Sequence, residues 1–341
     1  MSTTATTMKA ARFLQQGGDL TLVDMPIPTP AKNQIRIKVV ACGVCHSDVL
    51  GKYGFPGLSW PRTPGHEVAG VVEALGEGVT KFKIGEKVGV GWYGGHCASC
   101  SSCDEDEFIL CSEGKVCGIH FDGGYAEYMV APVDSVARIP DDLSFEQAGP
   151  LMCAGITVYN SIRNQNIKAG AIVAIQGIGG LGHLAIQFAK KLGFEVVAFS
   201  SGADKEKLAR ELGAKHYING ALPGAVDELA KLKPKLIVTT APHTKSVQEL
   251  IKAMALGGKL LILSALMEPL QVNSLELLSK KQSIAGWASG DNRDSEDTMK
   301  FAVNNNVFPM IETFPLEKAG QALQHTLDNK VRFRSVITIN H

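Results

Sequence analysis

The chain has 341 residues, of which 45% are hydrophobic and 20% charged, the composition of an ordinary globular protein. This length allows one large domain or two ordinary ones, each with its own core. The 34 basic and 34 acidic residues cancel, so the charge balance argues against a nucleic-acid partner or an acidic tail.

The N-terminal segment MSTTATTMKAARFLQQGGDL has no apolar stretch of signal-peptide length. No later run reaches the about 18 apolar residues that span a bilayer. We therefore expect a cytoplasmic protein without a membrane partner. A weak transit peptide is the less favoured interpretation of the Ser/Thr-rich start.

Short strands separated by turn residues are expected in the first part of the chain. The segments at 35–44, 68–79, 83–92 and 123–132 are rich in Val and other strand-forming residues and are interrupted by Gly. They predict a domain made mainly of β-structure.

From Leu151 to about Trp287, short apolar segments alternate with amphipathic helical ones. This alternation predicts a parallel, doubly wound α/β sheet. The predicted strands, each followed by a helix, are 171–176, 195–200, 236–240 and 259–265. A further helix over 295–304 and a C-terminal strand in VRFRSVITIN complete the prediction.

The sequence GIGGLG joins the strand at 171–176 to the following helix and has the dinucleotide-binding pattern G-x-G-x-x-G. Gly177 permits the tight turn, Gly179 lets the backbone approach a pyrophosphate, and Gly182 allows close packing of helix and strand. With Gly180 and Leu181, these residues form the predicted cofactor-binding turn, where the helix N-terminus favours phosphate charge.

The end of the second strand of this fold distinguishes NAD(H) from NADP(H). An acidic residue there would bind the ribose 2′-hydroxyl and repel a 2′-phosphate. The position carries Ser200 and Ser201, with Lys205 nearby, whereas Glu195 stands at the opposite end of the strand. We expect NADP(H), with NAD(H) as the alternative, because Asp204 weakens the positive charge and the serines could simply cap a helix.

Cys97, Cys100, Cys103 and Cys111 follow the pattern C-x2-C-x2-C-x7-C in a loop rich in Ser and acidic residues. Four thiolates close a tetrahedral shell and leave no open position, which is typical of a structural zinc site. His96 is a competing ligand by position, but the cysteines already complete the shell.

Cys45, His66 and Cys153 form a second, dispersed group of potential ligands. Two thiolates and one imidazole would bind zinc and leave a fourth position for water or substrate, as in a catalytic site. Taken singly, Cys153 could be a buried apolar thiol and His66 a turn residue.

The motifs GVCHSD, PGHE, the four-cysteine loop, LMCAGIT and GIGGLG, in this order, closely resemble the zinc-dependent medium-chain alcohol dehydrogenases, including the microbial and cinnamyl-alcohol-dehydrogenase-like members. The resemblance covers nearly the whole chain. It implies hydride transfer between a primary alcohol or aldehyde, aliphatic or aromatic, and NADP(H) or NAD(H), with two zinc ions per chain.

The resemblance also implies an architecture. A GroES-like β-barrel catalytic domain would contain residues 1–154 and 288–341, and a Rossmann cofactor domain would contain residues 155–287. A homodimer or homotetramer is implied as well, and a strand such as KLLILSA at 259–265 is a candidate to lie near an intersubunit edge.

By the same resemblance, Cys45, His66 and Cys153 hold the catalytic zinc. Asp48 orients His66, and Glu67 lies behind the metal as an occasional further ligand.

Four more residues take roles from the resemblance, and one position departs from the family pattern. Ser47 is the proton-relay hydroxyl. Many relatives continue this relay with a histidine, but Leu50 stands there, so proton release is expected to run through water with an unusual pH profile. The remaining cofactor contacts are His46 and Arg334 at the pyrophosphate and Thr157 at the nicotinamide.

Trp92 matches a pocket-lining position of the family, and Trp60 lies in a loop before the zinc histidine. Two tryptophans favour a flat or medium-sized apolar substrate. Either tryptophan could instead be a core residue, and for Trp60 the two interpretations are equally good.

Other classes fit the sequence less well. Zinc-free quinone or enoyl reductases would lack Cys45, His66 and Cys153 together, and polyol dehydrogenases commonly have a carboxylate in place of Cys153. A non-catalytic structural relative would not need this ligand set and relay serine.

Overall fold

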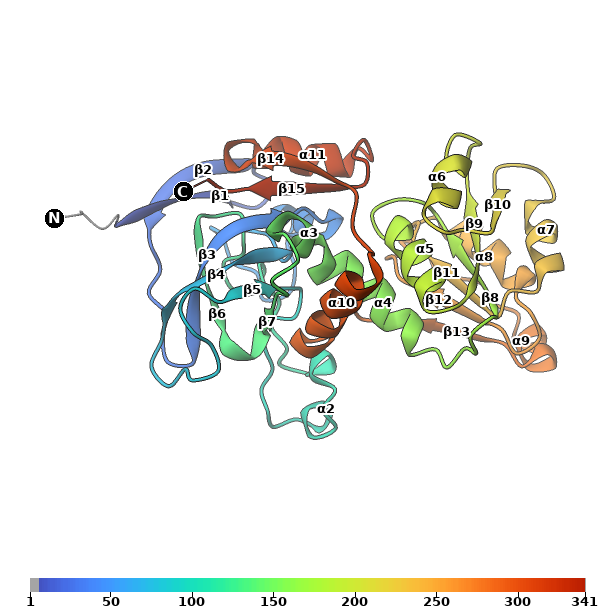
Figure 1. The fold of residues 1–341 in the computed structure, drawn as a ribbon, viewed down its shortest axis with the longest axis horizontal. Coiled ribbons are helices and arrows are strands. Elements are labelled where there is room, and N and C mark those ends of the chain that lie inside the picture. Colours follow the sequence, from blue (N-terminus) through green and yellow to red (C-terminus); the bar gives the residue numbers. More distant parts are fainter. Residues whose placement is uncertain (1–5, 341) are drawn as a thin grey trace. The chain divides into compact units, whose positions relative to one another are not determined.

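A computed structural model describes residues 6–340 and divides the chain into two compact units. Unit 1 contains Met1–Ile156 and Ser289–His341, and unit 2 contains Thr157–Ala288. In Figure 1 the first unit carries both the blue N-terminal and the red C-terminal elements. Both chain ends therefore belong to the same unit, with the second unit inserted between them.

Unit 1 is built on a seven-stranded sheet with the order β14-β15-β3-β4-β5-β7, in which β6 also pairs with β3, and on the separate pair β1-β2. Its strands are β1 (Thr7–Phe13), β2 (Leu20–Pro26), β3 (Gln34–Gly43), β4 (Val68–Leu75), β5 (Lys87–Val90), β6 (Tyr128–Pro132), β7 (Val136–Arg138), β14 (Ile311–Pro315) and β15 (Arg334–Thr338). All pairings except β14-β15 are antiparallel.

The helices of unit 1 are short, except for α10. They are α1 (Leu50–Tyr53), α2 (Ser101–Asp104), α3 (Phe145–Pro150), α10 (Asn292–Asn305) and α11 (Ala319–Leu327). Helix α10 begins with a capping box in which Asp291 accepts from the backbone of Asp294 and the Asp294 side chain accepts from the backbone of Asp291.

Burial alternates along β3, so one face of this strand packs against the hydrophobic core of unit 1. Ile35, Ile37 and Val39 are fully buried, and the residues between them are partly exposed. This period of two is that of a strand with one face against the core. The predicted strands at 35–44, 68–79, 83–92 and 123–132 overlap β3, β4, β5 and β6, respectively.

Unit 2 contains a six-stranded parallel sheet with the order β10-β9-β8-β11-β12-β13. Its elements are α4 (Ile156–Arg163, which begins one residue earlier), β8 (Ile172–Gln176), α5 (Gly182–Lys191), β9 (Glu195–Ser200), α6 (Glu206–Glu211), β10 (His216–Asn219), α7 (Ala225–Leu232), β11 (Leu236–Thr239), α8 (Thr244–Leu250), β12 (Lys259–Ile262), α9 (Ser274–Lys280) and β13 (Ser283–Gly286). Numbered within the unit, the strand order is 3-2-1-4-5-6, that of a dinucleotide-binding sheet. The predicted doubly wound sheet is confirmed.

The segment KLLILSA lies next to an edge of the sheet, and its predicted place near an intersubunit edge stays a prediction. Strand β12, in this segment, pairs with β11 on one side and β13 on the other. Strand β13, which was not predicted because its SIAG sequence is short and has small residues, is the edge strand. Within residues 6–340, no helix is both long and apolar enough to cross a bilayer.

Candidate active site and metal centres

Four potential ligands from three separate segments of unit 1 meet at one point. Cys45 precedes the 3-10 turn His46–Val49, His66 and Glu67 precede β4, and Cys153 lies in a π-helical turn that follows α3. One ligand atom from each of the four residues lies within 4.8 Å of all the others. The Sγ atoms of Cys45 and Cys153 are 3.9 Å apart. This arrangement could hold one metal ion.

Asp48 fixes the orientation of His66. Its Oδ1 lies 2.9 Å from His66 Nδ1, and its Oδ2 accepts from the Cys45 backbone N–H at 2.8 Å. Burial opposes protonation of the imidazole, but the charge and hydrogen bond of Asp48 raise the His66 pKa well above its ordinary value. Because Nδ1 faces Asp48, Nε2 is the nitrogen that faces the thiols.

The two thiols have opposite pKa shifts. A hydrogen bond from Cys153, supported by His66, lowers the pKa of Cys45, whereas the same sulfur–sulfur contact and burial raise the pKa of Cys153. The Cys45 thiol therefore loses its proton easily, and the resulting negative charge opposes deprotonation of Cys153. A divalent cation with affinity for sulfur and imidazole would stabilise both thiolates, and zinc fits this donor set.

Glu67 completes the group and is joined to the C-terminal strand. The Arg334 guanidinium donates to Glu67 Oε1, and the two side chains are 5% and 0% exposed. Burial raises the Glu67 pKa to about 7, although Arg334 opposes the shift. Among the described residues, Glu67 Oε2 has no hydrogen-bond partner, so it remains free for another ligand. Arg334 is thus engaged inside unit 1, and its predicted pyrophosphate contact stays a prediction.

The four-cysteine loop forms a second compact cluster around α2. Cys97, Cys100, Cys103 and Cys111 also have their sulfur atoms within 4.8 Å of one another. Backbone hydrogen bonds from Ser112 and Cys103 lower the Cys100 pKa to about 6, while burial raises the Cys111 pKa to about 11.

His96 lies outside this sulfur cluster. Its ring stacks on Phe108 with 4.2 Å between centroids, and its Nδ1 pairs with the Tyr93 hydroxyl. Four thiolates are enough to complete the shell of a structural zinc without it.

The glycine-rich turn of unit 2 has the geometry that the sequence pattern requires. Gly177 has a φ of +89°, which favours glycine. A Cβ on Gly182 would lie 1.9 Å from Gly177 O, so only glycine fits there. A Cβ on Gly179 would meet nothing within 4 Å, which leaves room beside the backbone at that position. Gly180 and Leu181 lead directly into α5.

Ser200 ends β9 and is buried, Ser201 is exposed, and Lys205 stands at the N-cap of α6. Glu195, at the other end of β9, pairs with Lys215 and His216. Its carboxylate is therefore already engaged at the amino end of the strand.

Thr157 lies near the start of α4 and is 9% exposed. The contacts predicted for Ser200, Ser201, Lys205 and Thr157 involve a bound cofactor and remain predictions.

Three other predicted residues lie beside the first cluster. Ser47 Oγ is 3.1 Å from Cys45 Sγ and 3.4 Å from His66 Nε2. Next to Ser47 in the same turn, His46 is exposed, and Leu50 begins α1. The Ser47 hydroxyl is therefore placed to contact a molecule bound by the cluster.

The two tryptophans occupy different surroundings. The Trp92 ring meets the His66 ring edge to face, with 5.1 Å between centroids. Trp60 packs against the core of unit 1, and its indole N–H donates to Gly51 O at 2.8 Å.

Two residues that contact predicted site residues were not predicted from the sequence. Phe55 meets Trp92 edge to face at 6.2 Å between centroids. The Tyr125 hydroxyl donates to Asp48 Oδ2 at 2.9 Å. The sequence around Tyr125 indicates only a strand, and no motif in the sequence predicts a contact between Tyr125 and Asp48.

Comparison with known proteins places the whole chain in one family. Residues 31–141 match the model of the alcohol dehydrogenase GroES-like domain, and residues 180–304 match that of the zinc-binding dehydrogenases. The chain is 44% identical to an alcohol dehydrogenase, notN, of Aspergillus sp. (strain MF297-2), over 98% of both chains. It belongs to the zinc-dependent medium-chain alcohol dehydrogenases.

Other alcohol dehydrogenases support the same assignment. The patD alcohol dehydrogenase of Penicillium expansum is 43% identical over 99% of both chains. A solved cinnamyl alcohol dehydrogenase of Sorghum bicolor (SbCAD4) is 29% identical over 97% of both chains, with a TM-score of 0.89. The predicted GroES-like and Rossmann fold and the predicted alcohol or aldehyde oxidoreduction are confirmed, and the chain is a zinc-dependent oxidoreductase acting on small molecules.

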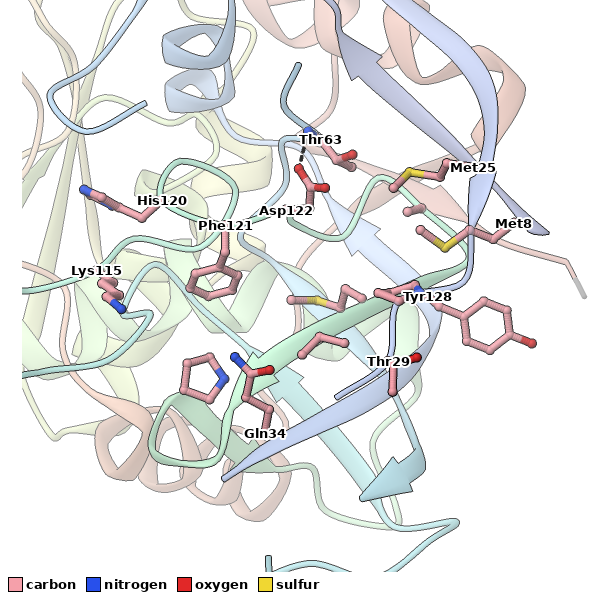
Figure 2. Close-up of a pocket in the computed structure, with 15 residues that line it drawn as sticks. Met8, Met25, Thr29, Gln34, Thr63, Lys115, His120, Phe121, Asp122 and Tyr128 are labelled. Carbon is pink, nitrogen blue, oxygen red and sulfur yellow. Dashed lines mark hydrogen bonds between the residues drawn. The ribbon is translucent and has the colours of Figure 1, made fainter. Parts of the chain in front are cut away.

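A cavity of about 340 Å³ in this alcohol dehydrogenase is lined by residues outside the two sulfur clusters, several of which are labelled in Figure 2. Met8, Met25, Thr63 and Asp122 are among its lining residues, and none of the predicted site residues lines it. Asp122 accepts from the Thr63 backbone N–H at 3.0 Å (Figure 2). Because the metal-ligating groups lie elsewhere, we assign this cavity no part in the reaction.

Proposed function

We propose that the chain oxidises primary alcohols and reduces aldehydes at a zinc ion held by Cys45, His66 and Cys153. The observation that carries the proposal is the convergence of two thiols, one imidazole and one carboxylate within 4.8 Å. Three protein ligands leave one position for substrate, as in catalytic zinc sites. When bound, zinc supplies Lewis acidity, which favours the deprotonated alcohol and polarises an aldehyde.

The surrounding residues prepare this donor set. Asp48 holds Nδ1 of His66 at 2.9 Å and thereby presents Nε2. Arg334 holds Oε1 of Glu67 and leaves Oε2 without a partner. We propose that Glu67 acts as an occasional further ligand from this position.

Ser47 is proposed to handle the substrate proton. Its hydroxyl lies within 3.4 Å of both Cys45 Sγ and His66 Nε2, so it can accept the proton of an alcohol bound at the cluster. Leu50 has no titratable group, and the proton therefore continues through water rather than through a side chain at that position.

The remaining assignments concern structure and cofactor. Residues 1–154 and 288–341 would form the catalytic domain, stabilised by a structural zinc on Cys97, Cys100, Cys103 and Cys111. Residues 155–287 would bind the nicotinamide cofactor.

NADP(H) is the proposed cofactor, with the pyrophosphate at Gly177–Gly182. Its 2′-phosphate would lie near Ser200, Ser201 and Lys205, because an acidic group is missing at the end of β9. His46 and Arg334 at the pyrophosphate and Thr157 at the nicotinamide complete the proposed contacts.

Aromatic or medium-sized apolar substrates fit the proposed site best. Phe55 and Trp92 form an edge-to-face pair, and Trp92 also contacts His66. Such rings favour a flat apolar molecule. The Sorghum bicolor relative is a cinnamyl alcohol dehydrogenase, which is consistent with an aromatic alcohol.

We propose that two copies associate through β13 and α9. Strand β13 ends the parallel sheet, and Leu275 and Leu278 on α9 are 70% and 77% exposed. An edge strand beside exposed leucines is suited to pairing with a second copy.

A cytoplasmic location is proposed because thiolate clusters require reducing conditions.

One experiment tests the reaction. NADPH and NADH oxidation would be followed at 340 nm with benzaldehyde and butanal on protein of known zinc content, before and after treatment with a chelator. We expect two zinc ions per chain and zinc-dependent turnover that is faster with NADPH. Equal turnover after complete zinc removal would contradict the proposal.

A further inference from the structure

We propose that Tyr125 is a positioning residue for the metal ligand His66, acting through Asp48. This inference rests on the proposed function, because it concerns how the proposed zinc site is held. Tyr125 matches none of the ligand motifs, and its contacts alone carry the argument.

Tyr125 reaches the ligand cluster through one continuous chain of hydrogen bonds. Its hydroxyl donates to Asp48 Oδ2 at 2.9 Å, and Asp48 Oδ1 lies 2.9 Å from His66 Nδ1. The exposed fractions of Tyr125, Asp48 and His66 are 0%, 2% and 2%. Water therefore cannot readily replace the phenol as the donor to this carboxylate.

Asp48 depends on this donor. Its Oδ2 accepts from the Cys45 backbone N–H and from Tyr125, while Oδ1 faces His66. A buried carboxylate that loses one of its donors becomes less well solvated and free to rotate. Rotation about Asp48 would turn the His66 ring, because His66 Nδ1 is bound to the same carboxylate.

The backbone holds Tyr125 in register with the segment that leads into His66. Tyr125 N donates to Pro64 O, Gly124 N to Gly65 O, and Gly123 N to Thr63 O, at 3.1, 3.0 and 2.8 Å. Asp122 strengthens the same junction by accepting from Thr63 N, the dashed bond in Figure 2. The two segments are thus joined at four successive points.

Gly65 allows the tyrosine ring to lie directly against this turn. Its φ is +104°, and a Cβ at this position would lie 2.5 Å from Tyr125 Cδ1. Only a glycine before His66 leaves space for the ring. The ring and the turn are therefore fitted to each other, and the hydroxyl is directed to Asp48.

Zinc binding provides the test, with the four-cysteine site as an internal control in the same molecule. Release of each zinc ion from Tyr125→Phe and wild-type protein would be followed by chelator competition. We expect the zinc at His66 to be bound about tenfold more weakly in Tyr125→Phe, the lower end of the effect of removing an outer-shell partner. The four-cysteine zinc should be unchanged.

A second readout separates positioning from general stability. Cobalt in place of the zinc at His66 should show a changed visible spectrum in Tyr125→Phe and an unchanged one in Tyr128→Phe, a matched loss of a hydroxyl three residues away. In an Asp48→Asn background, the further effect of Tyr125→Phe should fall below about twofold, because the two residues act in series.

The outcomes distinguish the two proposals. Wild-type protein that binds only the four-cysteine zinc would contradict the proposed catalytic zinc. Two bound zinc ions with the same affinity and cobalt spectrum in Tyr125→Phe as in wild type would overturn the role of Tyr125. Equal weakening of both zinc sites would also overturn it, since that result indicates a general loss of stability.

Discussion

Glu67 and Arg334 form a buried ion pair although 267 residues separate them in the sequence. Gly43 makes the pair possible, because a Cβ there would lie 1.9 Å from Glu67 Oε2. The pair links the segment that carries His66 to β15. The geometry of the ligand cluster therefore depends on the C-terminal strand.

Removing one partner of this pair should destabilise unit 1. We expect Arg334→Met to lower the free energy of unfolding by about 3–5 kcal/mol, because Glu67 would remain buried without its cation. The double variant Glu67→Gln/Arg334→Met should recover most of the loss. Urea unfolding measures both effects, and equal stability of the single and double variants would contradict the explanation.

The two metal clusters should respond differently to loss of one thiol. Cys153→Ser is expected to lose at least about a hundredfold in kcat and one zinc ion per chain, with a small change in Tm. Cys103→Ser should lose the other zinc and lower Tm by several degrees, since a structural metal contributes directly to folding. Metal analysis and calorimetry on the same samples would make the comparison. The reversed pattern would mean that the four-cysteine site is the catalytic one and the Cys153 site the structural one.

Two glycines of the cofactor turn form a matched pair for separating packing from binding. Gly182→Ala should destabilise unit 2 by about 1–3 kcal/mol, since the new methyl group would overlap with Gly177 O. Gly179→Ala should leave stability unchanged, because its methyl group meets nothing within 4 Å in the protein. It should weaken cofactor binding about tenfold or more by blocking approach of the pyrophosphate. Thermal unfolding and fluorescence titration with NADPH measure the two effects; unchanged NADPH affinity in Gly179→Ala would argue against a pyrophosphate there.

Cofactor preference should depend on the end of β9. Ser200→Asp places a negative charge where the 2′-phosphate is proposed to lie, so kcat/KM for NADPH should fall at least about tenfold, equivalent to about 1.4 kcal/mol. The value for NADH should change little. Ser200→Thr keeps the hydroxyl and serves as the control, and equal losses for both cofactors in Ser200→Asp would indicate a folding defect instead.

The proton route can be tested at Leu50. Leu50→His would add a titratable group, and the pH profile of kcat should gain a limb with an apparent pKa of about 6.5, the ordinary value of histidine. Leu50→Asn provides a polar side chain that does not titrate. A new limb in both variants, or in neither, would show that the proton leaves by a route that does not pass position 50.

Several features were predictable from the sequence because neighbouring residues determine them. The four-cysteine cluster lies within one loop, and its sulfur atoms meet as the spacing predicts. The glycine-rich turn was predictable for the same reason. The need for glycine at Gly177 and Gly182 comes from the local backbone conformation and from the close contact between the strand end and the following helix. Short runs of strand-forming residues between turns also located β3 to β6 in unit 1 and β8, β9, β11 and β12 in unit 2.

Other features were decided only by tertiary structure. Cys45 and Cys153 are 108 residues apart in the sequence, and they meet because α3, which leads into the turn with Cys153, packs beside β3 and β4. No sequence pattern linked Tyr125 to Asp48. None predicted that β13 is the edge strand and that β12 lies between it and β11. Local patterns fix backbone conformation because it depends on adjacent residues, whereas contacts between distant segments depend on strand order and on the shapes that the packed side chains leave for one another.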